Sequence, residues 1–297
     1  MTKKSNLRLF ALFVLPTLVC YLVLFVLPLV LGVALSFCRF STVENASFVG
    51  LENYRAALTG DDGFLRSMLF GLGFSLASVV LVNLVALGLA LLLTRKIRGA
   101  TVLRAVFFMP NLIGGIVLGY VWNLLVNGIL SNFGVDITFR AAYGFFGLLT
   151  LNVWQLGGYM AVIYIAALLA VPNETIEASR IDGAGAWQSL VYIKLPLILP
   201  SILICAFLTF TNAFKMFDQN LALTGGAPEG ETMLPALNIF NTFYGRAGAQ
   251  GVGQAKAVIF FIIVALLGYL QLKQGKENEN GTSKKRTRVG RAIQRRG

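Results

Sequence analysis

The sequence contains no histidine, and this absence removes the commonest general base and metal ligand of proteins. Cysteine is nearly as scarce, since Cys20, Cys38 and Cys205 lie in or beside apolar segments at spacings that suit neither a disulfide framework nor a metal site. The GxxxxGK[ST] pattern that cradles ATP phosphates does not occur. We therefore expect no catalytic residues, no metal, no cofactor and no enzymatic activity.

Charged residues are also few in this sequence. Charged residues make up 13% of the 297 residues, whereas 57% are hydrophobic and the mean hydropathy is +0.74. A typical soluble domain carries about 25% charged residues. The apolar residues come in runs long enough for membrane helices, which need about 20 residues each. The composition thus predicts an all-α integral membrane protein.

Six apolar runs predict six transmembrane helices. No charged residue lies between Arg8 and Arg39, and this run is longer than the apolar core of a signal peptide, so we expect a retained first helix. One membrane domain is expected over residues 1–275, followed by a basic tail over 276–297 whose polar composition predicts disorder. The expected spans are 9–37, 67–94, 102–126, 145–170, 196–217 and 256–272.

The distribution of basic residues predicts the orientation. With six spans both termini share one side, and 18 of the 25 lysines and arginines lie on that side. Basic residues concentrate in cytoplasmic loops, so both termini and the 172–195 loop are predicted to be cytoplasmic, with 218–255 outside. The net charge of +12 lies at helix ends and in the tail, which favours contact with membrane lipid and argues against nucleic acid.

The stretch from Glu174 to Pro200 contains charged residues, glycines and apolar residues, and lies between two long apolar segments. Asn173 is placed to act as a helix N-cap, and Gly183 and Gly185 predict a turn. A second helical stretch follows over residues 186–194, with Trp187, Leu190 and Val191 on one face. Two short helices at the membrane surface are expected.

This stretch resembles the EAA loop of permease subunits of binding-protein-dependent ABC importers. The resemblance implies the type I importer permease fold, with a coupling helix between the fourth and fifth spans that docks on a cytoplasmic ATPase subunit. Glu177, Ala178, Asp182 and Gly183 would make that contact, and an amphipathic linker is the alternative. The matching anchors are Glu177-Ala178-Ser179, Asp182-Gly183-Ala184, Gln188, Ile193, Leu195-Pro196 and Pro200, with Ser179 in place of the second alanine.

Three further stretches are similar to the sugar-importer branch, of the maltose and glycerol-3-phosphate permease type. They are FVGLENY at 48–54, MPNLIGGIVLGYVWNLLVNGILSN at 109–132 and FKMFDQNLALTGGAPEGETM at 214–233. The resemblance implies a bacterial or archaeal inner-membrane protein. Its implied partners are a second permease in a heterodimer, ATP-binding subunits and an extracytoplasmic binding protein.

The substrate implied by that branch is a sugar or an oligosaccharide, with glycerol-3-phosphate or a polyol as the alternative. A rival of another class is an ion-coupled secondary transporter, and a membrane scaffold without transport is a further one. Secondary transporters usually carry ionisable residues deep in the bilayer. The centres of the expected spans carry none, which argues against proton coupling.

Polar side chains share a face on each of two neighbouring spans. Asn152, Gln155 and Tyr159 recur at helical spacing on the fourth span, and Thr209 and Asn212 do so on the fifth. Polar groups in a membrane helix usually face protein or a cavity. Amides, a hydroxyl and an aromatic ring suit a sugar, so these five residues form the predicted substrate path. Hydrogen bonding between helices is the alternative.

Overall fold

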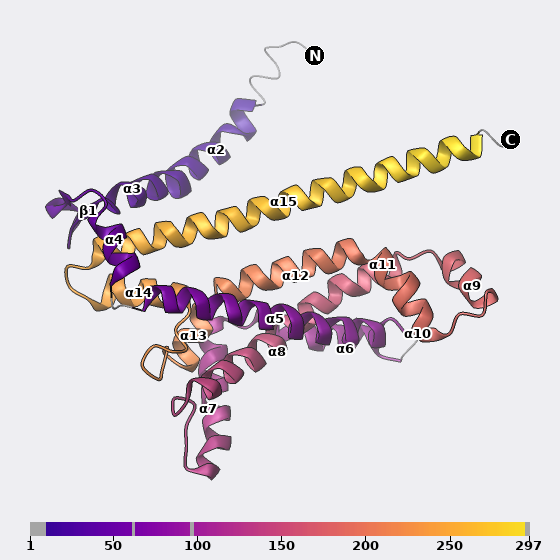
Figure 1. Cartoon of the computed structure of the whole chain (residues 1–297), viewed down its shortest axis with the longest axis horizontal. Helices are drawn as coiled ribbons and strands as arrows, with labels where there is room; N and C mark the ends of the chain where they lie inside the picture. The colour runs from indigo at the N-terminus through magenta and orange to yellow at the C-terminus, as the bar shows by residue number, and fades with distance from the viewer. Residues whose placement is uncertain (1–9, 61–62, 96–97, 295–297) are drawn as a thin grey trace. The chain divides into compact units, whose positions relative to one another are not determined.

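The computed structural model describes residues 10–60, 63–95 and 98–294 of the chain, which are mostly helical (Figure 1). The chain divides into two compact units. Unit 1 comprises residues 1–65 and 238–262, and unit 2 comprises residues 66–237 and 263–297. Helices α5 (Phe64–Leu93), α14 (Pro235–Gly245) and α15 (Gln250–Gln294) each contribute residues to both units.

Unit 1 begins with a nearly continuous apolar helix whose side chains are largely exposed, as suits a surface in contact with lipid. Its parts are α2 (Leu15–Tyr21), the π-helical η1 (Leu22–Val26) and α3 (Leu27–Leu35). A short antiparallel hairpin follows, in which Cys38 lies opposite Phe48 and Arg39 opposite Ser47. The hairpin and the next helix comprise β1 (Cys38–Arg39), η2 (Val43–Asn45), β2 (Ser47–Phe48) and α4 (Glu52–Thr59).

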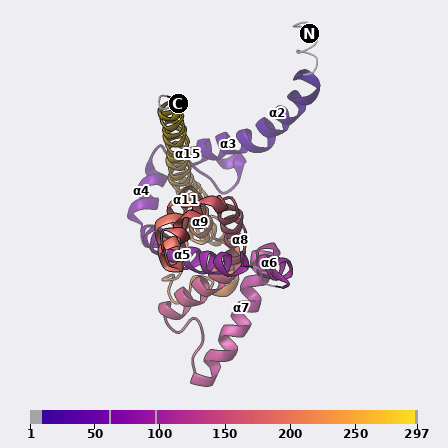
Figure 2. The ribbon, with the colours of Figure 1, turned by 90° about the vertical axis from the view of Figure 1, so that its right-hand side faces the viewer.

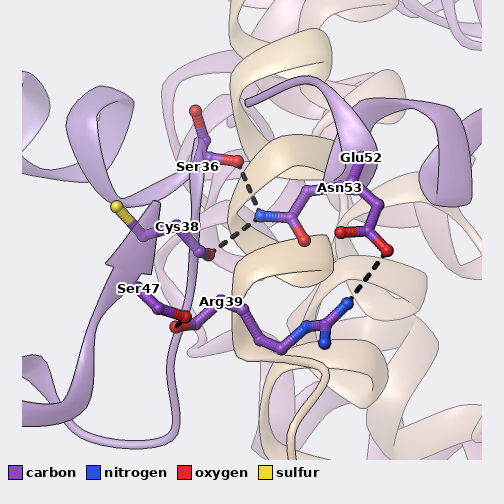
Figure 3. Close-up of polar contacts among 6 residues, drawn as sticks. All are labelled: Ser36, Cys38, Arg39, Ser47, Glu52 and Asn53. Atoms are coloured by element: carbon purple, nitrogen blue, oxygen red, sulfur yellow. Dashed lines mark hydrogen bonds and ion pairs between the residues drawn. The ribbon is translucent and has the colours of Figure 1, made fainter. Parts of the chain in front are cut away.

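The buried amide of Asn53 fixes the hairpin to α4 (Figure 3). Its Nδ2 donates to the carbonyl oxygens of Ser36 and Cys38, each at 2.9 Å. Arg39 pairs with Glu52 at 2.9 Å on the surface. Gly251, at the start of α15, lies so close to the Cys38 carbonyl that a Cβ there would overlap it. The FVGLENY segment therefore ties together the end of the first helix, α4 and the start of α15.

Unit 2 surrounds α8, the most buried of the apolar spans. Two buried clusters hold it, one formed with residues of α5 and α12 that include Val82 and Cys205, the other with Phe74, Leu118 and Ala213. The elements here are α6 (Ala100–Phe108), η3 (Met109–Leu112), α7 (Gly115–Leu130), η4 (Ser131–Phe133), α8 (Ala141–Leu169), α9 (Asn173–Ile181), α10 (Ala186–Ser189), η5 (Leu190–Lys194), α11 (Leu195–Leu197), α12 (Leu199–Phe214) and α13 (Asp218–Leu223).

The described residues include five helices that are long and apolar enough to cross a membrane, or six when one bent pair counts as a span. The bent pair is 186–197 with 199–214, at an angle of 71°. Pro200 has no N–H to donate to the carbonyl of Pro196, which explains the break at Ile198. The all-α membrane fold is confirmed.

The prediction that residues 102–126 form one continuous third span is wrong, because the helix is interrupted between α6 and α7. The chain changes direction between α6 and α7 in both views (Figures 1 and 2). Pro110 lacks an amide hydrogen, η3 is a 3₁₀ turn and Gly114 is extended, so α7 starts afresh at Gly115. Only α7, extended through η4, qualifies as a span among the described part of this region.

Two other segments differ from the sequence expectation. The segment 218–255, which is predicted to lie outside, contains α13 and α14, and α15 starts at Gln250 rather than near residue 256. The structure continues α15 to Gln294, where composition predicts a disordered tail. Lysine, arginine, glutamine and glutamate are good helix formers, which gives this polar stretch a local helical preference. The domain boundary at residue 275 stays a prediction.

Candidate coupling loop and substrate path

The loop between α8 and α12 contains two short helices joined by a tight turn. The N–H of Ala184 donates to the carbonyl of Ser179 at 2.9 Å, and that of Gly183 to Arg180 at 3.1 Å. This Schellman pattern ends α9 and requires a left-handed residue, which Gly183 supplies with φ +81°. Gln188 Oε1 then accepts from the Gly185 N–H at 2.8 Å and closes the start of α10. The turn predicted from the two glycines is confirmed.

The start of α9 differs from the expected cap. Asn173 is the first helical residue, and Pro172 occupies the N-cap position without a side-chain cap. Proline has a fixed φ near −65° and no N–H to satisfy, so it can begin the helix directly. The helix therefore starts one residue earlier than expected, and the rest of the loop is unchanged.

The four predicted contact residues of the loop, Glu177, Ala178, Asp182 and Gly183, are all exposed. Beside them lie three large apolar side chains that are also exposed: Ile181 by 87%, Trp187 by 73% and Tyr192 by 75%. Ser179 instead points inward, and its hydroxyl donates to the Ile176 carbonyl at 2.7 Å. Exposed apolar groups on an otherwise polar loop are typical of a protein contact surface.

The structure brings three of the five predicted path residues into hydrogen bonds between helices. Asn152 Nδ2 donates to Ser78 Oγ at 3.0 Å, which joins α8 to α5. Gln155 Oε1 accepts from Gln219 Nε2 at 2.8 Å, which joins α8 to α13. Thr209 Oγ1 accepts from Asn83 Nδ2 at 3.3 Å and donates to a carbonyl of its own helix.

The side chains of the other two path residues are more exposed than those of the first three. The Asn212 side chain is exposed on α12, and its Nδ2 donates to the Leu208 carbonyl at 2.8 Å, so its Oδ1 faces away from the helix backbone. Tyr159 is half-buried and its ring meets Phe108 edge-on, with centroids 6.1 Å apart. Of the five path residues, these two make no side-chain hydrogen bond to another helix within the described part of the chain.

Sequence reasoning missed several polar residues that the structure uses. Tyr164 on α8 donates to Asn83 Oδ1 at 2.7 Å, so the Asn83 side chain of α5 is hydrogen-bonded to both α8 and α12. Tyr164 lies at i+5 from Tyr159, so helical spacing did not place it with the predicted stripe. Gln219 was overlooked because it lies beyond the expected fifth span, in a segment expected to be a loop.

Lys256 is a further omission. It is the first residue of the expected span 256–272, but α15 starts earlier, at Gln250, and Lys256 is fully buried in unit 1. Its Nζ donates to Asn238 Oδ1 at 3.0 Å and Thr242 Oγ1 at 2.8 Å, and lies 5.4 Å from the centre of the Phe64 ring. The expectation concerned only the centres of the spans, and Lys256 lies nearer the start of its span, Gln250–Gln271. It falls inside the helix because α15 starts earlier than its composition indicates.

Comparison with known proteins identifies the family to which these features belong. Residues 83–274 match the model of a family described as the binding-protein-dependent transport system inner membrane component. The chain belongs to this family. The resemblance to an ABC importer permease seen in the EAA loop is confirmed, and ion-coupled secondary transport receives no support. Within the described residues, no group of three or more Cys, Asp or Glu could hold a metal ion.

Curated relatives cover most of the permease. The probable starch degradation products transport system permease protein AmyD of Thermoanaerobacterium thermosulfurigenes is 39% identical over 269 residues, covering 88% of this chain and 91% of that protein. The trehalose/maltose transport system permease protein MalF of Thermococcus litoralis is 32% identical over 276 residues, covering 89% and 92%.

Solved structures support the same fold. A bacterial ABC transporter that imports the acidic polysaccharide alginate matches the permease with a TM-score of 0.74 at 18% identity, over 91% of this chain and 96% of that chain. A second structure of a bacterial alginate transporter, in complex with a pentasaccharide-bound periplasmic protein, also gives 0.74, at 20% identity. At these identities the likeness shows the fold of an importer permease.

Proposed function

We propose that this permease forms part of the membrane path through which an ATP-driven importer takes up a neutral sugar or oligosaccharide. The observation that carries the proposal is the set of uncharged amides, hydroxyls and aromatic rings on α8 and α12, within a chain of the importer family. The names of the relatives, which concern starch degradation products, trehalose and maltose, support a sugar over glycerol-3-phosphate. The chain itself would catalyse no bond chemistry.

The proposed partners follow from the family and from the exposed loop. A cytoplasmic ATP-binding subunit would dock on Glu177, Ala178, Asp182 and Gly183, with the exposed apolar side chains around them. An extracytoplasmic binding protein would deliver the sugar, as supported by the alginate transporter that was solved with its periplasmic protein. A second permease would complete the path as a heterodimer.

The decisive test of this function is uptake by the reconstituted complex. The permease, its partner permease, the ATPase and the binding protein would be placed in liposomes and offered maltose, maltotriose, trehalose and glycerol-3-phosphate. We expect ATP-dependent uptake of at least one sugar and none of glycerol-3-phosphate. Uptake of glycerol-3-phosphate alone would contradict the proposal.

The orientation gives a separate prediction, with both termini and the loop around α9 in the cytoplasm. In a background without the native cysteines, Glu231→Cys and Glu174→Cys place thiols at exposed positions of the two loops. A membrane-impermeant maleimide should label Glu231→Cys in intact cells, and Glu174→Cys only after permeabilisation. The reverse pattern would show that the permease is inserted the other way round.

The path residues are expected to separate into two groups. Asn212→Ala removes an exposed side chain and Tyr159→Ala a half-buried one, so sugar uptake should fall while assembly of the complex stays unchanged. Loss of one hydrogen bond costs about 0.5–1.5 kcal/mol, which corresponds to a partial defect of about 2- to 13-fold. Asn152→Ala instead breaks the bond to buried Ser78, and is expected to lower the yield of assembled complex.

Thr150→Val is the control for both groups, because Thr150 is exposed on α8 and its hydroxyl donates to the carbonyl of Phe146 in the same helix at 2.8 Å. Uptake relative to binding-protein-stimulated ATP hydrolysis is the quantity to compare. If Asn212→Ala and Tyr159→Ala lose assembly as Asn152→Ala does, all three side chains serve contacts between helices.

A further inference from the structure

We propose that Gln219 on α13 is a specificity-determining residue of the permease, which together with Gln155 recognises neighbouring hydroxyl groups of a passing sugar. The inference rests on the proposed function and adds to it an element beyond the two helices with the predicted path. The observation behind it is the contact between two carboxamides, Gln219 Nε2 and Gln155 Oε1, at 2.8 Å.

The hydrogen bond uses one N–H of Gln219 and the carbonyl oxygen of Gln155, and leaves the N–H groups of Gln155 and the carbonyl oxygen of Gln219 available. Each carboxamide has two N–H donors and one carbonyl oxygen with two acceptor sites. Among the described residues, Gln155 Nε2 donates to no other group and Gln219 Oε1 accepts from none. Neither atom is fully buried without a partner, since Gln219 is half-buried and Gln155 retains 8% exposure.

The free groups complement a diol. A sugar hydroxyl both donates and accepts, so one hydroxyl can accept from Gln155 Nε2 while its neighbour donates to Gln219 Oε1. The pairing bond joins the two carboxamides, so the remaining donor and acceptor belong to one hydrogen-bonded pair, as recognition of two neighbouring hydroxyls requires. Neither amide carries charge, so the pair can distinguish hydroxyl arrangements but offers no counter-charge to a phosphate.

The position of Gln219 is fixed by close packing of α13 on α7. A Cβ on Gly115 would lie 2.6 Å from Asp218 Cβ and 3.0 Å from Gln219 Cδ, and one on Gly119 would lie 2.8 Å from Ala222 Cβ. At the other end of α13, Asn123 Nδ2 donates to the Leu223 carbonyl at 2.6 Å. The two glycines and this hydrogen bond therefore hold α13 where Gln219 reaches α8.

The test compares selectivity rather than activity, because a purely structural role would lower the uptake of every sugar alike. In the complete reconstituted complex, the uptake of maltose, maltotriose and trehalose is measured per ATP hydrolysed. Gln219→Leu removes the acceptor and the pairing bond, and should change the ratio between two of these sugars about 2- to 10-fold. Gly115→Ala, which displaces Gln219 without altering its chemistry, should change the ratio in the same direction.

Thr150→Val serves as the matched control and should leave all ratios unchanged. Equal losses for every sugar in Gln219→Leu, or unchanged ratios with normal assembly, would overturn the role of Gln219 and leave the proposed function intact. A complex with the unaltered chain that imports none of the three sugars would instead overturn the proposed function. If Gly115→Ala does not assemble, Gln219→Leu decides the outcome by itself.

Discussion

Glu177→Lys is expected to abolish import while the permease remains folded in the membrane. Glu177 is exposed on α9, and the structure gives its carboxylate no hydrogen bond or ion pair with any described residue. An exposed substitution of this kind usually changes stability by no more than about 0.5 kcal/mol. At a docked interface, disrupting a buried charge pair costs about 2–5 kcal/mol or more. The ATPase should no longer co-purify with the permease.

Two variants make this prediction specific. Glu177→Gln removes the charge without reversing it and should give a smaller defect. Glu174→Lys reverses an exposed charge one turn earlier on the same helix, outside the predicted contact set, and should retain most of the import. Normal uptake together with normal recovery of the ATPase in Glu177→Lys would refute a contact at this carboxylate.

Gly158→Val should prevent the permease from assembling, in contrast to Gly157→Ala beside it. A Cβ on Gly158 would overlap the carbonyl group of Phe107, which is backbone of α6 and cannot rotate away. Overpacking in a core costs about 1–3 kcal/mol, and a clash with backbone is expected to reach or exceed that range. On Gly157 the nearest atom, Val85 Cγ1, would lie 3.6 Å from the added Cβ, which is ordinary contact.

The yield of monodisperse complex after detergent extraction and its thermal midpoint would measure the difference. Gly157→Ala should match the unaltered chain in both. Equal behaviour of the two variants would show that α6 and α8 are not in contact at Gly158.

The sequence was sufficient for features that depend on local composition. Long apolar runs predicted the spans near α5 and α8 within a few residues, because hydrophobic length is a strong signal. The turn at Gly183 was predictable because a left-handed position selects glycine. The fixed spacing of the EAA loop is sufficient to identify the family from the sequence.

Features that depend on contacts distant in sequence were less predictable. Composition did not reveal that Pro110 and Gly114 divide the third apolar run, because both halves remain apolar. Helical spacing predicted that Asn152 and Gln155 share a face of α8, but their partners, Ser78 and Gln219, lie 74 and 64 residues away. Only the packing of α5 and α13 against α8 identifies those hydrogen bonds.

The 71° bend at Ile198 has a mechanical consequence for the proposed docking of an ATPase on the loop that precedes α12. The segment before the bend belongs to the loop that carries Trp187, and the segment after it is α12, which carries Asn212. At this angle, a force along the first segment acts mainly across the axis of the second and only slightly along it. A displacement of the loop would therefore tilt α12 sideways rather than slide it through the membrane, and the tilt would change the direction in which the Asn212 side chain points.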